Sequence, residues 1–219
     1  AKLVRDGVLE NSESPYVSQL LEVPKRDVAS NRVGTPVVLD PRGVNAITTP
    51  IFNPSARLDR VSELLSRRSA FLQFGMADFY LQFELEKESR QIITAIVGNK
   101  HYQFKRVPFG VRNVPMHVQA QMDRVLADVA SIVVPFMDDI LGGVFVLQEL
   151  PYALKAVLDY RRKYRISLKP SKCSIGFPTL SALGFVHSSI GRKPDPKKVE
   201  AMMGMPPPQC AGKDKCDRS

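Results

Sequence analysis

The alternation of apolar and polar positions changes character several times along the chain. Residues 132–147, IVVPFMDDILGGVFVL, place two short apolar runs on either side of two adjacent carboxylates. Such runs, rich in Val and Ile, are typical of buried strands, so this stretch predicts a β-hairpin with Asp138 and Asp139 at its tip. Pro135 lacks a backbone N–H, and its strand is therefore expected at a sheet edge.

Four other stretches repeat apolar residues at helical spacing. Residues 57–67 predict an amphipathic helix with a basic outer face. Pro115 and Pro151 each suit the first position of a further helix, and an apolar face continues after each of them. Residues 193–203 resemble the start of one more helix. The helices are thus spread along the chain and alternate with the expected strands.

Several remaining stretches favour strands. Residues 71–85 are dense in aromatic side chains and alternate imperfectly, which favours a strand over a helix. Residues 92–97 and 101–107 lie on either side of Gly98-Asn99, a sequence typical of a hairpin turn. Residues 180–187 predict a further strand.

The two ends of the chain differ from this middle part. Residues 1–55 are rich in Pro and Ser and predict extended segments and short strands joined by turns such as Asn53-Pro54. Residues 203–219 have no apolar period and predict a disordered tail. Helices and short antiparallel strands thus mix without a regular βαβ alternation. The pattern predicts an α+β fold in which helices back an antiparallel sheet on one face.

Composition adds one feature to this picture, a basic charge. The chain has 31 Lys and Arg residues against 22 acidic residues, a net charge of +9 that fits a polyanionic partner, nucleic acid first. The three cysteines, Cys173, Cys210 and Cys216, form no CxxC pair or zinc spacing. No apolar run reaches membrane-spanning length. We therefore expect a reduced, intracellular protein with no membrane partner.

The acid pair carries the strongest candidate chemistry. Adjacent carboxylates repel each other, and Asp138 and Asp139 are poorly placed beside a hydrophobic core unless a cation compensates them. A hard divalent ion such as Mg²⁺, held by carboxylates and substrate phosphates, would do so. A solvated hairpin turn accounts for the same two residues. An unrelated metal hydrolase that uses the pair is a third interpretation.

Six segments, in the same order along residues 6–202, resemble the reverse transcriptases of LTR retroelements, most closely the gypsy type. They are DGVLENSESPYVSQLLEVPK, VVLDPRGVNAIT, FLQFGMADFYLQF, VPFGVRNVPMHVQAQMDRVL, FMDD and LKPSKCSIGFPTLSALGFVHSSIGRKPDPKKVEAM. The resemblance implies the fingers and palm of a right-hand polymerase over residues 1–202, with the palm core at about 70–190. It also implies that the thumb and the RNase H domain are absent.

The resemblance further implies an RNA-directed DNA polymerase that acts on a primed RNA or DNA template with dNTPs, inside an element's cytoplasmic particle or the nucleus. Reverse transcriptases of this kind hold two Mg²⁺ ions, or Mn²⁺, with three carboxylates: the acid pair and one Asp on an earlier strand. The residues implied for nucleotide binding are Tyr80, Phe109, Gly110, Met137 and Lys172, and those implied for the primer grip are Leu183 and Gly184. Several of these positions have a simpler explanation as a core aromatic, an ordinary turn or a solvated lysine.

The third carboxylate is where the sequence departs from the family pattern. Aligning residues 71–83 without a gap places Gly75 on the catalytic Asp, and Asp78 falls three residues later. Making Asp78 the metal ligand requires a deletion of three residues before Tyr80, whereas the ungapped alignment keeps residues 88–90 in phase with the family. We therefore expect impaired catalysis, with Asp78 as a conditional third ligand. The alternative is a catalytically silent nucleic-acid-binding remnant.

Overall fold

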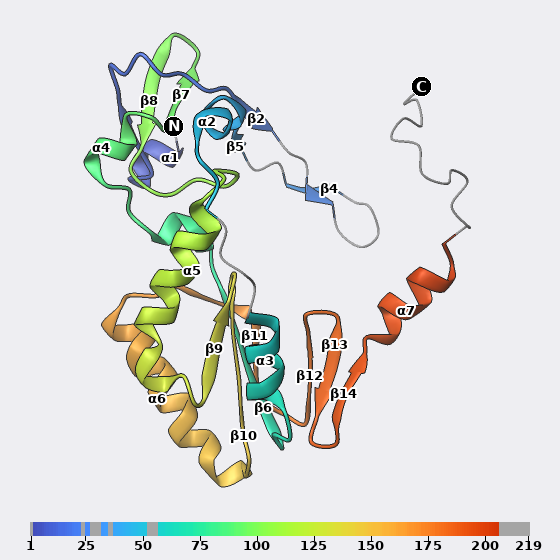
Figure 1. The fold of residues 1–219 in the computed structure, drawn as a ribbon. Helices are drawn as coiled ribbons and strands as arrows, with labels where there is room; N and C mark the ends of the chain where they lie inside the picture. Colours follow the sequence, from blue (N-terminus) through green and yellow to red (C-terminus); the bar gives the residue numbers. More distant parts are fainter. Residues whose placement is uncertain (1, 23–24, 27–31, 35–36, 52–56, 206–219) are drawn as a thin grey trace.

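The computed structural model describes residues 2–22, 25–26, 32–34, 37–51 and 57–205 (Figure 1). The chain has an upper part of short strands and helices and a lower part built on a four-stranded sheet. Most of the predicted disordered tail, and the predicted turn at Asn53-Pro54, lie outside the described residues. Among the described residues, no helix is long and apolar enough to cross a membrane.

The lower part is a sheet of four antiparallel strands in the order β11-β6-β10-β9. Their bounds are Ala70–Met76 for β6, Val133–Phe136 for β9, Asp139–Val144 for β10 and Leu168–Phe177 for β11. The predicted acid-tipped hairpin is confirmed as β9 and β10, which are joined by Met137 and Asp138. Pro135 lies in β9, an edge strand, as its missing N–H predicted.

Two long helices, α5 (Val114–Val125) and α6 (Leu150–Lys163), cover one face of this sheet (Figure 1). Successive side chains of a strand point to opposite faces, so every second residue of β6 enters a core shared with these helices. Each helix begins one residue before its predicted proline. The core includes Leu72, Phe74, Val118, Met122, Ile140 and Val157, each at most 4% exposed.

A third helix, α3 (Arg57–Leu65), packs against the opposite face of the sheet. Its Val61 and Leu65 form a separate buried cluster with the other set of alternating residues, which includes Phe71 of β6 and Leu141 of β10. The expectation that helices back only one face is therefore wrong. The apolar stripe of an amphipathic helix must be buried, and the second sheet face supplies the surface that buries it.

The strand expected over residues 71–85 stops halfway. β6 ends at Met76, Asp78 adopts a left-handed backbone conformation with φ of 42°, and the 3₁₀ helix η1 spans Phe79–Gln82. The Leu81 N–H donates to the Asp78 carbonyl at 2.8 Å, which closes the turn. The density of aromatic residues in this stretch thus reflects burial in the core, and the prediction was wrong beyond Met76.

The single strand expected over residues 180–187 is a hairpin in the structure. Leu183 and Gly184 form its turn, with φ values of 56° and 84°. Such a turn is difficult to predict within an apolar run because the glycine is its only signal in the sequence. The resulting small sheet consists of β12 (Thr179–Ala182), β13 (Phe185–Ser188) and β14 (Gly191–Pro194).

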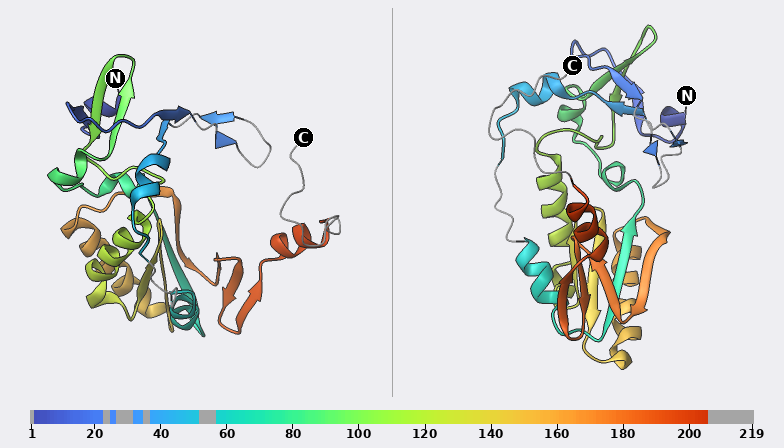
Figure 2. Two further views of the ribbon diagram at one scale, coloured as in Figure 1. Left: turned by 45° about the horizontal axis from the view of Figure 1, so that its top comes forward. Right: turned by 90° about the vertical axis from the view of Figure 1, so that its right-hand side faces the viewer.

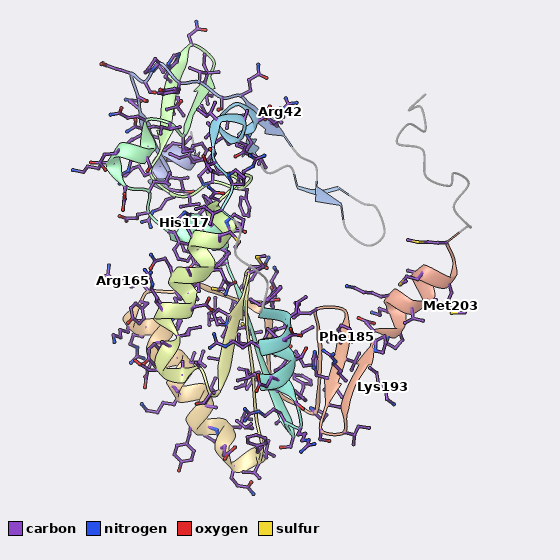
Figure 3. All side chains as sticks on the ribbon, in the orientation of Figure 1. Arg42, His117, Arg165, Phe185, Lys193 and Met203 are labelled. Carbon is purple, nitrogen blue, oxygen red and sulfur yellow. The ribbon has the colours of Figure 1, made fainter. Side chains whose placement is uncertain are left out.

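The last helix, α7 (Pro196–Met203), confirms the helix predicted at this end of the chain. The Asp195 carboxylate caps it by accepting the Lys197 N–H at 3.0 Å. The helix projects away from the four-stranded sheet, and Met203 near its end is 83% exposed (Figure 3). Figure 2 shows, in its left view, that α7 and the β12–β14 sheet lie on the side away from α5 and α6.

The upper part contains small antiparallel sheets and short helices. The hairpin predicted around Gly98-Asn99 is confirmed as β7 and β8. The short strands predicted over residues 1–55 are confirmed by β1, β2 and β5, whereas the helices α1 and α2, which are too short to show a helical period, were not predicted. The strands are β1 (Leu9–Asn11), β2 (Leu20–Glu22), β3 (Lys25–Arg26), β4 (Arg32–Gly34), β5 (Val37–Leu39), β7 (Thr94–Val97) and β8 (Lys100–Phe104). The helices are α1 (Lys2–Arg5), α2 (Arg42–Ile47) and α4 (Lys87–Arg90), and the 3₁₀ helices η2 (Ala127–Val129) and η3 (Leu147–Glu149) belong to the lower part.

Candidate active site at the hairpin tip

The tip of the β9–β10 hairpin places both acids at one end of the sheet. Asp139 is the first residue of β10, and its ladder partners are Phe136 in β9 and Gly75 in β6. Asp138 lies in the turn, where its carbonyl accepts the Met76 N–H at 2.7 Å. The strands on both sides therefore hold the backbone of the acid pair.

A buried amide, which the sequence analysis missed, fixes the same tip from below. Gln119 of α5 is 2% exposed; its Nε2 donates to the Pro135 carbonyl at 2.8 Å, and its Oε1 accepts the Met137 N–H at 3.0 Å. Met137 has a φ of 52°, a left-handed conformation that non-glycine residues rarely adopt. The sequence signal for this buried amide was a glutamine that lies between Val118 and Met122, two apolar positions of the predicted helix.

The electrostatics of the pair is dominated by burial and by one lysine. Burial raises the pKa of the Asp139 carboxyl, the neighbouring Asp138 raises it further, and a hydrogen bond from Gln73 Nε2 at 3.3 Å opposes both. Lys172 Nζ lies 3.1 Å from Asp138 Oδ2. Two adjacent carboxylates were expected to need a compensating cation. The cation that contacts Asp138 in the described part of the chain is this ammonium group.

Gly75 occupies the position opposite Asp139 where the sequence pattern expects a third carboxylate. Asp78 instead follows the end of β6, at the start of η1. Among the described residues, no three acidic, His or Cys side chains are grouped so that they could hold a metal ion. Asp78, Asp138 and Asp139 therefore do not form the group of three carboxylates that was expected to hold two divalent ions.

A pocket of about 550 Å³ lies beside the acid pair and gathers most of the residues predicted for the site. Tyr80 stands edge-on to Phe109, with ring centroids 5.1 Å apart. Burial first, and then Asp138, raises the pKa of the Tyr80 hydroxyl. The predicted residues that line the pocket are Asp78, Tyr80, Phe109, Met137, Asp138 and Lys172.

The loop that carries Phe109 is held by an amide from the upper part. Asn45 of α2 donates from Nδ2 to the Gly110 carbonyl at 2.9 Å and accepts the Arg112 N–H at 2.8 Å. Gly110 has a φ of +95°, a conformation that favours glycine. Gly110 is not among the residues that line the pocket, and its assignment to nucleotide binding stays a prediction. No role was predicted for Asn45, whose hydrogen bonds join segments distant in sequence.

Leu183 and Gly184, predicted for the primer grip, are not among the residues that line this pocket. Leu183 packs against the buried cluster under α3. The Gly184 carbonyl accepts the Asp195 N–H at 3.0 Å, which ties the β12–β13 turn to the start of α7. The turn lies on the sheet where Figure 3 labels Phe185 and Lys193. Their assignment to primer binding stays a prediction.

Comparisons with known proteins agree over almost the whole chain. The family described as "Reverse transcriptase (RNA-dependent DNA polymerase)" matches residues 23–194. The retrovirus-related Pol polyproteins from transposons 412 and 297 of Drosophila melanogaster are 30% and 29% identical over 96% and 94% of this chain. The chain spans only 17% and 20% of their lengths.

A solved structure of a reverse transcriptase has the same fold as this chain. The foamy viral protease-reverse transcriptase in complex with double-stranded DNA matches with a TM-score of 0.83 at 20% identity, over 94% of this chain and 35% of that one. At this identity the likeness concerns the fold alone. The predicted α+β architecture, with an antiparallel sheet and packed helices arranged as fingers and palm, is confirmed.

Proposed function

This chain belongs to the reverse transcriptase (RNA-dependent DNA polymerase) family, and from this premise we propose that residues 1–202 form the fingers and palm of a retroelement reverse transcriptase with impaired nucleotidyl transfer. Its partners are a primed RNA or DNA template and dNTPs, in the element's particle or the nucleus. The ladder pairing of Asp139 with Gly75 carries the proposal. That pairing leaves the acid pair without a third carboxylate on the neighbouring strand.

Impairment follows from the charge that nucleotidyl transfer must stabilise. Two divalent ions, Mg²⁺ or Mn²⁺, would supply positive charge at the reacting phosphorus and at both oxygens in line with it. Ions about 4 Å apart need bridging carboxylates. Asp138 and Asp139 are the acids at the hairpin tip, Asp78 lines the same pocket without forming a group of three with them, and Lys172 already contacts Asp138. The site therefore has one carboxylate too few to hold both ions.

The pocket beside the acids supports a nucleotide site in spite of this loss. Tyr80 and Phe109 form an aromatic wall of this pocket, which suits contact with a nucleobase and its sugar. Met137 lines the same pocket from the hairpin turn. We assign these three residues to contact with the base and the sugar, and Gly110 to the shape of the loop behind them.

Binding of nucleic acid is supported by charge. The chain carries a net charge of +9. On β14, the Arg192 guanidinium lies 5.0 Å from the ring centroid of Phe185, an arrangement that leaves a cation beside an aromatic face. Cations near aromatic rings suit the phosphates and bases of a nucleic acid strand. We therefore assign the β12–β14 sheet, including Leu183 and Gly184, to the primer side of the site.

A catalytically silent nucleic-acid-binding remnant is the second candidate function. The ion pair between Lys172 and Asp138 favours it, because an ammonium group on a catalytic acid opposes binding of a metal ion. Both candidates predict binding of a primer–template duplex. They differ in whether any primer extension depends on the acid pair.

Two measurements test these functions. Fluorescence anisotropy of a labelled RNA–DNA primer–template should show binding that weakens by about tenfold or more between low and physiological salt. Primer extension with Mg²⁺ and then Mn²⁺ should be slow but detectable, and Asp138→Asn should abolish it. If the unchanged chain extends the primer no more than the Asp138→Asn variant does, the chain is the catalytically silent remnant. Absence of salt-dependent duplex binding overturns both candidates.

A further inference from the structure

We propose that Lys172 is an internal counter-ion of the acid pair, seated where a carboxylate at position 75 and a divalent ion would otherwise lie. This inference rests on the proposed function only in treating Asp138 and Asp139 as the acid pair. On this inference the third carboxylate cannot be restored at position 75 alone, because Lys172 must change with Gly75.

The backbone of β11 bulges opposite Gly75. Leu168 is the ladder partner of Met76, but the next partner of β6 is Cys173, which faces Phe74. Residues 169–172 therefore stand against the single residue Gly75. A bulge places extra residues on one strand and redirects their side chains. This one carries Lys172 over the position at which a side chain of residue 75 would start.

The space above Gly75 is already filled by the stem of Lys172. A Cβ atom at position 75 would lie 2.4 Å from Lys172 Cβ, 2.9 Å from its Cδ and 3.2 Å from its carbonyl oxygen. The Cβ and the carbonyl oxygen belong to the rigid part of the residue, so rotation of the lysine side chain does not relieve the overlap. Any residue larger than glycine at position 75 requires the bulge to move.

The ammonium group at the end of that stem compensates the acids. Nζ lies 3.1 Å from Asp138 Oδ2, and both side chains are 49% exposed, so the pair forms at the mouth of the pocket and not in the core. A divalent ion bound by Asp138 would have to displace this cation or lie beside it. Like charges at such distances repel, so the ion pair lowers the affinity of the acids for a metal ion.

A simple repair of the third carboxylate should therefore fail. Gly75→Asp alone places a new side chain into the stem of Lys172 and leaves the ammonium group on Asp138. Lys172→Gly removes both the stem and the charge. The pair of substitutions is expected to restore the space and the charge together, which neither achieves alone.

Binding of Mn²⁺ alone, followed by the loss of the electron paramagnetic resonance signal of free Mn²⁺, tests this without primer or dNTP. Lys172→Met keeps most of the stem and removes the charge, and it should bind Mn²⁺ about tenfold more tightly than the unchanged chain. Adding Asp138→Asn should abolish the gain. Lys155→Met, which breaks an exposed ion pair with Asp159 on α6, is the matched control and should leave the affinity unchanged.

The steric part of the inference is tested in the same assay. Gly75→Asp should bind Mn²⁺ no more tightly than the unchanged chain, whereas Gly75→Asp with Lys172→Gly should bind it most tightly of all. Equal affinity of these two variants overturns the steric part. Lys172→Met binding like the unchanged chain, or a gain that survives Asp138→Asn, overturns the counter-ion. If thermal melts show that the variants at position 75 do not fold, Lys172→Met alone decides the matter.

Primer–template binding, measured beside Mn²⁺ binding, separates this inference from the proposed function. If the chain binds no primer–template, the reverse transcriptase proposal is overturned, and the Mn²⁺ affinities of the Lys172 variants still test the counter-ion inference. A chain that binds primer–template normally while Lys172→Met binds Mn²⁺ no better overturns the counter-ion alone.

Discussion

The two faces of the four-stranded sheet are made by the same strands, but one face forms the core and the other carries the acid pair. On the face under α5 and α6, Leu72, Phe74 and Ile140 are at most 2% exposed. On the other face, α3 covers only part of the surface, and the residues toward the hairpin tip become polar, from Gln73 to Asp139. Neighbouring residues of one strand thus contribute to the core and to the site in turn.

This difference shows where the fold can lose a functional group without losing its stability. Gly75 belongs to the partly covered face, at the end that the helices leave open. A carboxylate missing there removes no apolar contact from the core under α5 and α6. The bulge of β11 then fills the space with Lys172. The core and the acid pair are therefore separable, and substitutions on alternate residues can test that separation.

The largest effect is expected from neighbouring residues of β6. Phe74→Ala opens a cavity in the helix-covered core and should lower the free energy of unfolding by about 3–5 kcal/mol. Gln73→Ala, one residue away on the other face, removes a hydrogen bond to a partly exposed acid and should cost about 1 kcal/mol or less. Urea unfolding of both variants measures the contrast. Similar losses would mean that the two faces are not separate in energy.

The sequence predicted the core face well because its signal is local. Alternation along β6 and the apolar runs of β9 and β10 follow from the period of a strand, which a short window reveals. The acid pair stood out for the same reason. The strand over 180–187 was wrong because the turn depends on two residues with positive φ, Leu183 and Gly184, inside an apolar run. Short α2 was missed because six residues show no helical period.

The site itself was predicted only in part, because much of it depends on tertiary contacts. The alignment alone flagged Gly75, and the structure adds that it faces Asp139. The bulge that brings Lys172 to Asp138 has no signature in the sequence of β11. Gln119 and Asn45 act through backbone groups distant in sequence. Such amides look like ordinary polar residues until the fold brings their partners within reach.

A smaller effect is expected where the core face meets the hairpin tip. Gln119→Leu leaves the Pro135 carbonyl and the Met137 N–H without their partner, and should cost about 1–3 kcal/mol for the buried groups left unsatisfied. Hydrogen exchange of the Met137 amide should speed up in the same variant. Gln121→Leu, exposed on the same helix, is the control and should stay within about 0.5 kcal/mol. Unchanged Met137 exchange would show that Gln119 does not hold the tip.

The smallest effect concerns the charge of the acid pair and depends on pH. Burial, and then Asp138, raises the folded pKa of the Asp139 carboxyl. An acid whose folded pKa is raised binds its proton more tightly in the folded chain, so its ionisation costs stability. That cost is absent below the unfolded pKa and fully present once the pH exceeds the folded pKa.

Asp139→Asn should therefore raise the melting temperature at neutral pH, and the gain should vanish as the pH falls below the ordinary range of an aspartate. Calorimetry of this variant across that range, beside Glu63→Gln on the exposed side of α3, measures the difference. A loss of stability at neutral pH would mean that the contacts of Asp139 with Gln73 and Lys172 outweigh its burial. A gain would show a pH-dependent loss of stability on the face that carries the acids, whereas the buried members of the core cluster on the other face are all apolar.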